Sequence, residues 1–318
     1  MNLFTDSSRG RSMAKDPSVV FWQGSYWLFY SIPPWDDGRT GDGWRIGIAR
    51  GDKVSDFGSW RKVGELSPEY ASEANGLCAP GAVVLGGALF LFYQTYGNGP
   101  RDAICVARST DGEHFERHPL NPIVRARGGW NNGRAIDAEA LVIGERLMLY
   151  FATRDPQGNI QMLGAASAEL SQDLGRSWQR DFAPEAWRAE DESGSILKPE
   201  LSWEQDCIEA ATVLMRGGKY FLFYAGAYNN APQQIGCAVS RDGVRFERLS
   251  REPLLPNGGP GSWNSSESGH PGVFTDRDGS AHLFFQGNAD GGRTWFLAHA
   301  RIEWAGEAPG EAPRIEFD

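Results

Sequence analysis

Four ionisable side chains stand at the start of apolar, strand-like segments, where charge is unusual. Asp16, Asp137 and Glu209 each precede a run of apolar residues, and His270 does the same nearer the C-terminus. A charged side chain is seldom buried unless it has an interaction partner or a functional role. Carboxylates brought close together raise the pKa of at least one of them, so that one can donate a proton while another accepts one. These residues are therefore candidates for general acid–base chemistry.

The four residues open a pattern that occurs five times along the chain. A short apolar strand, a polar or Gly-rich turn and a second strand rich in aromatic residues begin at Asp16, Ala79, Asp137, Glu209 and His270. The starts are 63, 58, 72 and 61 residues apart. A second element, with a small-residue strand, a turn and an aromatic residue, follows at 46–60, 104–115, 162–178 and 235–246, and in a shorter form at 296–304.

Each of the five units therefore has two strands in its hairpin and two in its second element. Five units of four strands predict an all-β fold, a five-bladed β-propeller, in one domain over residues 1–318. The rival all-β fold, a sandwich, does not predict a period near 60 residues. The aromatic residues that recur in the outer elements are expected in the cores of the blades: Trp60, Phe115, Trp178 and Phe246. Residues 1–12 and 305–318 are expected to be loose, the latter as a surface strap.

The first strand of each propeller blade lines the central channel, so the five starting residues should form a ring at one mouth. The ring is predicted to consist of Asp16, Ala79, Asp137, Glu209 and His270. Each residue also has an ordinary explanation, because Asp-Pro at 16–17 suits a turn and a lone histidine is often structural. Their recurrence at one register favours a chemical site.

The loops that leave each second strand should line the same mouth. They cover 32–44, 95–102, 153–159, 227–234 and 288–295. Their candidate binding residues are Trp35, Asp36, Tyr96, Arg154, Tyr228, Asn229 and Arg293. Flat aromatic rings, amides and arginines suit a polar ligand with apolar faces, such as a sugar.

Composition excludes several other partners. The net charge of −10 argues against nucleic acid and anionic membranes. The longest apolar run, 82–93, is interrupted by Gly86 and Gly87, which predicts a hairpin and not a membrane span. The N-terminal residues lack the apolar core of a signal peptide, so a cytoplasmic protein is expected unless the start has been trimmed. The four cysteines have no CxxC spacing and are predicted to be buried thiols.

The motifs resemble those of glycoside hydrolase family 43, which is related to the propeller families 32, 68, 117 and 130. "DPSVVFWQGSYWLFYS" from Asp16 is similar to the general-base motif, and "AIDAEALV" around Asp137 to the motif whose Asp tunes the acid. "CIEAATVLMRGGKYFLFYAG" around Glu209 resembles the general-acid motif. The resemblance also implies a position for His270 near a central ion, often calcium, and substrate contact by Arg293.

The resemblance implies an inverting glycosidase for arabinofuranosides, xylosides or similar sugars, and the short loops favour an exo-acting pocket over a long cleft. Asp16 would activate water, Glu209 with a raised pKa would protonate the leaving oxygen, and Asp137 would orient Glu209. Glu139 is a rival carboxylate, one step deeper on the same strand face as Asp137. No cofactor is expected to be required, and a structural calcium ion in the central channel is an alternative that the resemblance allows. A phosphorylase using Arg154 or Arg293, a retaining furanosidase and a non-catalytic sugar-binding propeller are the alternatives.

Overall fold

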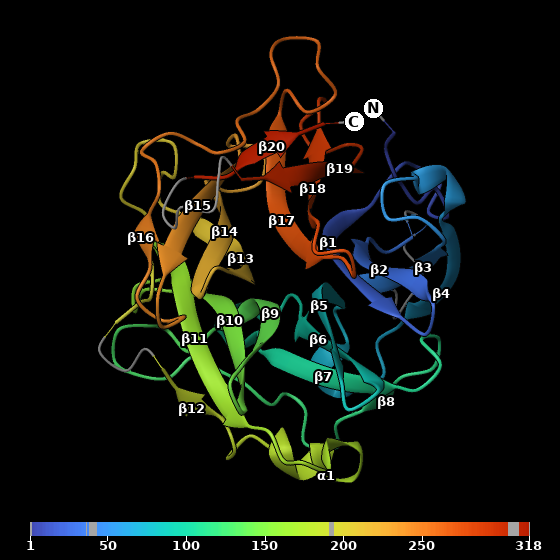
Figure 1. Ribbon diagram of the computed structural model, residues 1–318, viewed down its shortest axis with the longest axis vertical. Coiled ribbons are helices and arrows are strands. Elements are labelled where there is room, and N and C mark those ends of the chain that lie inside the picture. The colour runs from blue at the N-terminus through green and yellow to red at the C-terminus, as the bar shows by residue number, and fades with distance from the viewer. Residues whose placement is uncertain (1, 36, 38–42, 191–193, 305–311, 318) are drawn as a thin grey trace.

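Five four-stranded antiparallel sheets surround a central channel (Figure 1). This computed structural model describes residues 2–35, 37, 43–190, 194–304 and 312–317. The sheets follow one another along the chain, and the innermost strands contact their neighbours all the way round, with β17 against β1 closing the ring. The predicted all-β five-bladed propeller is confirmed.

Within each blade the strands run from the channel outward in chain order. Blade one has β1 Lys15–Trp22, β2 Ser25–Ile32, β3 Arg45–Gly51 and β4 Arg61–Leu66. Blade two has β5 Leu77–Leu85, β6 Ala88–Thr95, β7 Ile104–Ser109 and β8 Glu116–Arg117. Blade three has β9 Ile136–Ile143, β10 Arg146–Arg154, β11 Gln161–Glu169 and β12 Arg188–Ala189. Blade four has β13 Ile208–Arg216, β14 Lys219–Gly226, β15 Gln234–Ser240 and β16 Glu247–Arg248. Blade five has β17 Glu267–Thr275, β18 Ala281–Asn288, β19 Phe296–Glu303 and β20 Arg314–Glu316.

The inner hairpins form because their turns contain residues that tolerate a left-handed backbone. Gly86 and Gly87 have φ of 55° and 78°, and Gly217 and Gly218 have φ of 56° and 72°. Two consecutive residues with positive φ make a turn whose twist matches that of the flanking strands. Glycine adopts this conformation without a steric penalty, so these pairs fix where each hairpin reverses.

The second strands of the blades carry the largest buried rings. Tyr93 and Tyr224 are completely buried or nearly so, and their hydroxyls donate to Glu73 (2.6 Å) and Glu204 (2.7 Å). A buried hydroxyl needs such an acceptor, because an unpaired one costs free energy. Both glutamates end a Pro-Glu-x-x-x-Glu segment, at 68–73 and 199–204, so the repeat extends to the polar contacts that hold the blades.

Two expectations about the periphery were wrong. The N-terminal segment is not loose, because the buried Phe4 bridges to Leu297 and packs on Tyr30 with ring centroids 5.1 Å apart. The tail supplies the fourth strand of blade five, since β20 pairs with β19; residues 305–311 and 318 lie outside the described residues. The two termini lie side by side where blades five and one meet (Figure 1).

The outer element of blade three also differs from the prediction. Its aromatic residue Trp178 lies in the helix α1, Leu174–Asp181, and not beside a strand turn. Trp178 is buried as expected, but its ring lies 5.8 Å from Phe90 in blade two and so fills the space between blades. Three 3₁₀ turns complete the helical content of the described residues: η1 Phe57–Ser59, η2 Ala71–Glu73 and η3 Gly99–Arg101.

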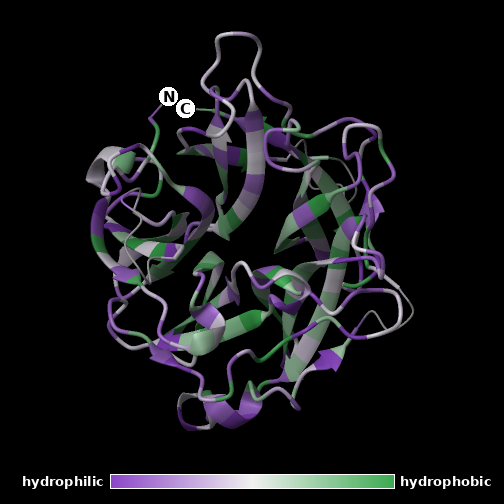
Figure 2. Ribbon diagram, turned by 180° about the vertical axis from the view of Figure 1, so that it is seen from behind, coloured by the Kyte–Doolittle hydropathy of each residue, from purple (hydrophilic) through white to green (hydrophobic). Residues whose placement is uncertain are grey.

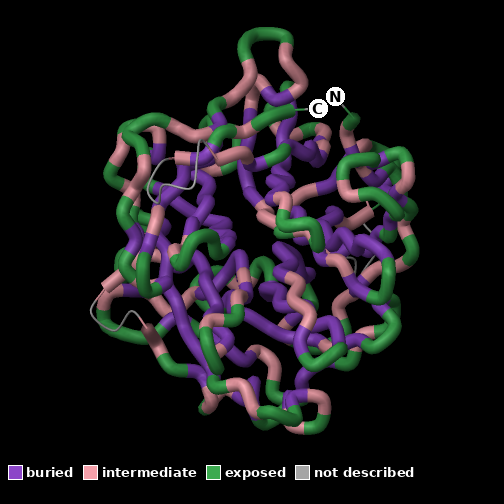
Figure 3. The backbone as a smooth tube through the Cα atoms, viewed as in Figure 1, coloured by how far each residue is buried: buried purple, intermediate pink, exposed green. Residues whose placement is uncertain are grey.

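Hydrophobic residues concentrate in the strands, and the connecting loops are mostly hydrophilic (Figure 2). The strands around the channel are largely buried and the loops at the periphery are exposed (Figure 3). Within the described ranges, no helix is long and apolar enough to cross a membrane.

Candidate active site

Each of the five inner strands has the same irregularity near its start. The pairing register with the second strand shifts there, and one residue in each shift has positive φ. These residues form what we call the mouth ring: Asp16 (53°), Ala79 (48°), Asp137 (54°), Ala210 (53°) and His270 (42°). A non-glycine residue in this region costs free energy and is kept only where the surrounding structure enforces it. A bulge of this kind re-aims a side chain, and here it turns the mouth ring into the channel.

Glu209 does not belong to the mouth ring, contrary to the predicted register. The residue of β13 with positive φ is Ala210, and Glu209 precedes it. By the same register Glu209 corresponds to the residues just before the other ring positions, which together we call the outer ring: Lys15, Cys78, Ile136, Glu209 and Gly269. The mouth-ring residues all line one channel cavity of about 30 Å³, and the outer-ring residues do not.

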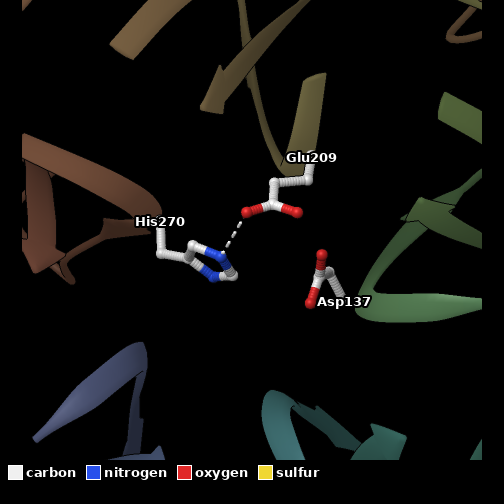
Figure 4. Close-up of side chains that lie close together, drawn as sticks. All are labelled: Asp137, Glu209 and His270. Carbon is white, nitrogen blue, oxygen red and sulfur yellow. Dashed lines mark hydrogen bonds and ion pairs between the residues drawn. The ribbon is translucent and has the colours of Figure 1, made fainter. Parts of the chain in front are cut away.

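The four predicted ionisable residues nevertheless meet. His270 Nδ1 lies 2.9 Å from Asp16 Oδ1, and His270 Nε2 lies 3.0 Å from Glu209 Oε1. Asp137 completes the group, because its carboxylate, that of Glu209 and the His270 ring each offer an atom within 4.8 Å of the others (Figure 4). We call these four residues the acidic cluster. Burial disfavours the charged form of His270. The Asp16 and Glu209 carboxylates outweigh this effect and raise the pKa of His270 well above its usual value.

Two amides hold the Glu209 carboxylate. Gln233 Nε2 donates to Oε1 at 2.8 Å, and Gln161 Nε2 donates to Oε2. Gln233 Oε1 in turn accepts the His270 backbone N–H at 3.2 Å. A Cβ at Gly269 would lie only 1.8 Å from that Gln233 oxygen, so the glycine is what makes room for the amide.

The pKa values of the two neighbouring carboxyls move in opposite directions. Burial opposes ionisation of Glu209, but His270, Gln233 and the Lys15 charge outweigh it and lower the pKa of Glu209. Burial and the charges of Glu209 and Asp16 raise the pKa of Asp137 to about 7, although His270 acts against them. The Oδ2 atom of Asp137 is buried without a hydrogen-bond partner. The expected crowding of carboxyls is therefore present, but the expected raised pKa of Glu209 is wrong for the free protein, because the donors around Glu209 stabilise its charge.

Asp16 is held in its ionised form. Burial opposes its charge, but His270 and Lys15 together lower the pKa of Asp16 well below its usual range. Gln286 Oε1 accepts the Asp16 backbone N–H at 3.0 Å. Lys15 lies with Nζ 4.5 Å from the centroid of the Trp295 ring, a cation–π contact that keeps this charge at the mouth.

Three of the predicted binding residues lie close to the cluster or to residues that contact it. Arg154 Nε donates to Gln161 at 3.1 Å, and its guanidinium lies 5.6 Å from the centroid of the Tyr228 ring. Asn229 Oδ1 accepts from Gln286 at 2.9 Å. These contacts place the end of β10 and the 227–234 loop beside Glu209 and Asp16, as the propeller geometry predicts.

The other predicted binding residues are more peripheral. Tyr96 is 41% exposed, and its ring centroid lies 5.7 Å from that of Trp44. The ring of Trp35 contacts the Arg9 guanidinium at 4.3 Å. Arg293 is exposed in the 288–295 loop, and for the described part of the chain no contact joins its side chain to the acidic cluster. Asp36 lies outside the described residues.

Several site residues were missed from the sequence: Lys15, Arg134, Gln161, Gln233 and Glu267. Gln161 is the first residue of β11 and Gln233 immediately precedes β15, so comparing the starts of the third strands would have found both. Glu267 is completely buried and accepts from Gln286 (2.6 Å) and from the Asn230 backbone N–H (2.6 Å), which ties blade five to the 227–234 loop.

Glu139 lies where strand alternation placed it, deeper in the cavity that Asp137 lines. Its Oε1 accepts a hydrogen bond from Thr212 at 3.0 Å, and burial raises the pKa of Glu139 to about 8 despite that bond. Beyond it the channel opens into a second space of about 450 Å³ lined mainly by apolar residues. Glu139 is therefore mostly neutral at neutral pH and lines both spaces.

The acidic cluster does not fit a calcium ion well. Calcium takes six to eight oxygen ligands, whereas Asp137, Glu209 and His270 offer carboxylate oxygens and an imidazole nitrogen. Both nitrogens of that imidazole are also engaged, by Asp16 and Glu209. We therefore assign no step of the chemistry to an ion at this position.

Comparison with solved structures shows which proteins share this architecture. The chain is similar to a thermostable family-43 glycoside hydrolase, with a TM-score of 0.71, 18% identity and coverage of 99% of this chain and 96% of that one. The chain has the fold of the family 43 glycoside hydrolases. An α-L-arabinofuranosidase from Lactobacillus brevis (TM-score 0.67, 16% identity, 95% and 93% coverage) is also similar. So is an α-L-arabinanase from Cellvibrio cellulosa complexed with arabinohexaose (TM-score 0.66, 19% identity, 96% of each chain).

Sequence comparison finds similarity over part of the chain. No protein-family model matches the chain. A β-1,2-mannobiose phosphorylase from Thermoanaerobacter sp. (strain X514) is 28% identical over 125 residues, which cover 35% of this chain and 39% of that protein. The match therefore spans well under half of either protein.

Proposed function

We propose that the protein is a glycoside hydrolase that uses general acid–base catalysis at the mouth of the propeller. The observation that carries the proposal is the acidic cluster itself: three carboxylates from three blades meet there, and their pKa values are driven apart. Titratable groups with such divergent environments are typical of acid–base catalysts. The similarity to family 43 structures supports the same conclusion through the fold.

Asp16 is the general base of this proposal. Its low pKa keeps it ionised, so it can take a proton from the water that attacks the anomeric carbon. Glu209 gives the proton to the leaving oxygen. Because Asp137 and Glu209 are close enough to titrate as a coupled pair, the proton that Asp137 holds near neutral pH is shared with Glu209. The proposal requires that this proton passes to Glu209 when substrate binds.

The geometry permits inversion. An imidazole ring spans about 2.2 Å between its nitrogens, so the His270 contacts of 2.9 and 3.0 Å place Asp16 Oδ1 and Glu209 Oε1 at most about 8 Å apart. Inverting enzymes place their carboxyls roughly 6.5–9.5 Å apart, against about 5–5.5 Å for retaining enzymes. The upper limit of this separation falls within the inverting range.

The proposed substrates are exposed terminal pentoses, such as α-L-arabinofuranosides or β-xylosides. This proposal is supported by the names of the structural neighbours, among them an arabinofuranosidase and an arabinanase bound to arabinohexaose. The aromatic ring of Tyr228, beside Arg154 at the mouth, suits stacking against a sugar.

A panel of aryl glycosides tests the function. Asp16→Asn and Glu209→Gln should each lower kcat by about 10²–10⁴-fold on whichever glycoside the protein cleaves. Glu139→Gln, which changes a carboxyl of the same channel outside the mouth, is the matched control and should stay close to wild type. Proton NMR of the first-formed anomer tests inversion. Full activity in either of the first two variants would refute the assignment.

A phosphorylase is the second candidate, favoured by the partial match to the mannobiose phosphorylase. It would use inorganic phosphate in place of water as the nucleophile. Turnover that requires phosphate and yields a sugar 1-phosphate would establish it, and turnover in phosphate-free buffer would exclude it as the main activity.

A further inference from the structure

Two arginines from different parts of blade three converge on one amide beside the acidic cluster. Arg134, which lies just before β9, donates from Nη1 to Gln161 Oε1 at 3.0 Å. Arg154, the last residue of β10, donates from Nε to the same oxygen at 3.1 Å. Since Gln161 Nε2 donates to Glu209, each guanidinium lies two hydrogen bonds from the proposed proton donor.

The positive charge of this pair is only partly compensated. Arg134 Nε lies 4.0 Å from Asp102 Oδ2 and is buried without a hydrogen-bond partner. Arg154 forms no ion pair with a carboxylate within the described residues, and its guanidinium lies against the Tyr228 ring. Buried or half-buried cations normally have a paired anion, so the donors that this pair leaves free can serve an anionic ligand.

The donors that remain suit an oxyanion. Each guanidinium uses one N–H on Gln161, and a guanidinium carries five N–H groups in a planar fork that matches carboxylate and phosphate. The Gln161 contact fixes both groups before any ligand arrives, which reduces the entropy lost on binding. The half-exposed Tyr228 offers a flat surface beside them for a sugar ring.

We propose that Arg134 and Arg154, bridged by Gln161, form a subsite for an anionic group, either the carboxylate of a uronosyl unit or a free phosphate. The uronosyl part of this inference rests on the proposed function, because it takes the ligand to be a glycoside. If the anion is a uronosyl carboxylate, the preferred glycoside would be a charged relative of the neutral pentosides proposed above, such as a β-glucuronide in place of a β-xyloside. Sequence reasoning pointed only to Arg154, because Arg134 lies in an irregular segment that the repeat does not cover.

Two measurements test the subsite. Calorimetry with sodium phosphate and with sodium glucuronate, each alone, measures anion binding independently of turnover. Aryl β-D-xyloside and aryl β-D-glucuronide differ only by the carboxylate on C5, so their ratio of kcat/KM reports recognition of that carboxylate. Arg134→Gln and Arg154→Gln should weaken binding of the preferred anion about 10- to 100-fold, and Arg154→Lys should restore part of it.

Arg277→Gln is the matched control, because Arg277 also lies over an aromatic ring, that of Phe21 at 3.9 Å, but is exposed and far from the mouth. It should bind both anions as wild type does. Phosphate binding alone assigns the subsite to free phosphate, and glucuronate binding together with a selective loss on the glucuronide assigns it to a uronosyl carboxylate.

The inference is overturned if neither anion binds to wild-type protein, or if Arg134→Gln and Arg154→Gln affect xyloside and glucuronide equally while anion binding is unchanged. The second result would mean that the arginines act only by orienting Gln161. If wild-type protein cleaves no glycoside, the proposed function fails, and calorimetry still decides the subsite. If it cleaves a neutral glycoside but binds no anion, only the subsite fails.

Discussion

Replacing Asp137 with asparagine should make the protein more stable at neutral and alkaline pH while lowering its activity. The pKa of Asp137 is about 7 in the folded protein, against 3.8 for an aspartate in the unfolded chain. Between these values the folded state keeps a proton that the unfolded state releases, so stability falls as pH rises from about 4 to about 7. Asparagine has nothing to ionise and does not suffer this loss.

The size of the effect follows from the shift. Each pKa unit corresponds to about 1.36 kcal/mol, so a shift of roughly three units in a fully buried carboxyl corresponds to about 4 kcal/mol at pH 8. The amide places an N–H where Asp137 Oδ2 has no partner, which costs about 1 kcal/mol at every pH. That cost cancels when the stability difference at pH 8 is compared with the difference at pH 4.

Urea unfolding of wild type and Asp137→Asn at pH 4, 6 and 8 measures the difference. Glu139→Gln is the matched control, because Glu139 is on the same strand and burial raises its pKa to about 8. It should show a similar pH-dependent gain in stability with little loss of kcat, whereas Asp137→Asn should lose activity. A pH-dependent gain below about 1 kcal/mol in Asp137→Asn would refute the view that Asp137 holds a proton in the free protein.

Three further substitutions test the contacts that support the acidic cluster and hold the blades together. His270→Gln removes the cation that keeps the pKa of Asp16 low, so the acidic limb of the kcat/KM profile should move to higher pH, and an unchanged limb would contradict this. Gly272→Ala would place a Cβ 2.2 Å from a backbone carbonyl of blade one and should lower stability by about 1–3 kcal/mol, measured by thermal unfolding. Glu204→Gln removes the buried carboxylate 2.8 Å from Arg248 and leaves only the exposed Glu200, 3.4 Å away. It should cost roughly 3 kcal/mol in urea unfolding, and a change below about 0.5 kcal/mol would count against this pairing.

The repeat in the sequence was enough to predict both the fold and the meeting of the acidic cluster. A period near 60 residues assigns one inner strand to each blade, and inner strands must start at one end of the channel. Residues as distant in sequence as Asp16 and His270 therefore come within 2.9 Å of each other. That prediction needed only the order of the strands, and not their detailed conformation.

The register within each strand could not be predicted in the same way. The bulge depends on backbone dihedrals, and in blade four neither Ala210 nor Ala211 marks it by residue type. Aligning the blades by their charged residues therefore placed Glu209 one position too far along. The terminal strand β20 was missed for a related reason, since it forms only because β19 offers an unpaired edge.

The offset between the two rings explains why neighbouring carboxyls differ in protonation. Asp137 is turned into the channel, where its Oδ2 finds no donor and burial dominates. Glu209, one residue earlier and one methylene longer, reaches amide donors at the starts of the third strands of two blades as well as His270. If position decides the role, then a double variant that moves the carboxylate by one residue, Glu209→Ala with Ala210→Glu, should be as inactive as Glu209→Gln although the net charge is unchanged. Its kcat on the preferred aryl glycoside measures this. Activity near that of wild type would show that a third carboxylate is needed, but that its position in the outer ring rather than the mouth ring is not.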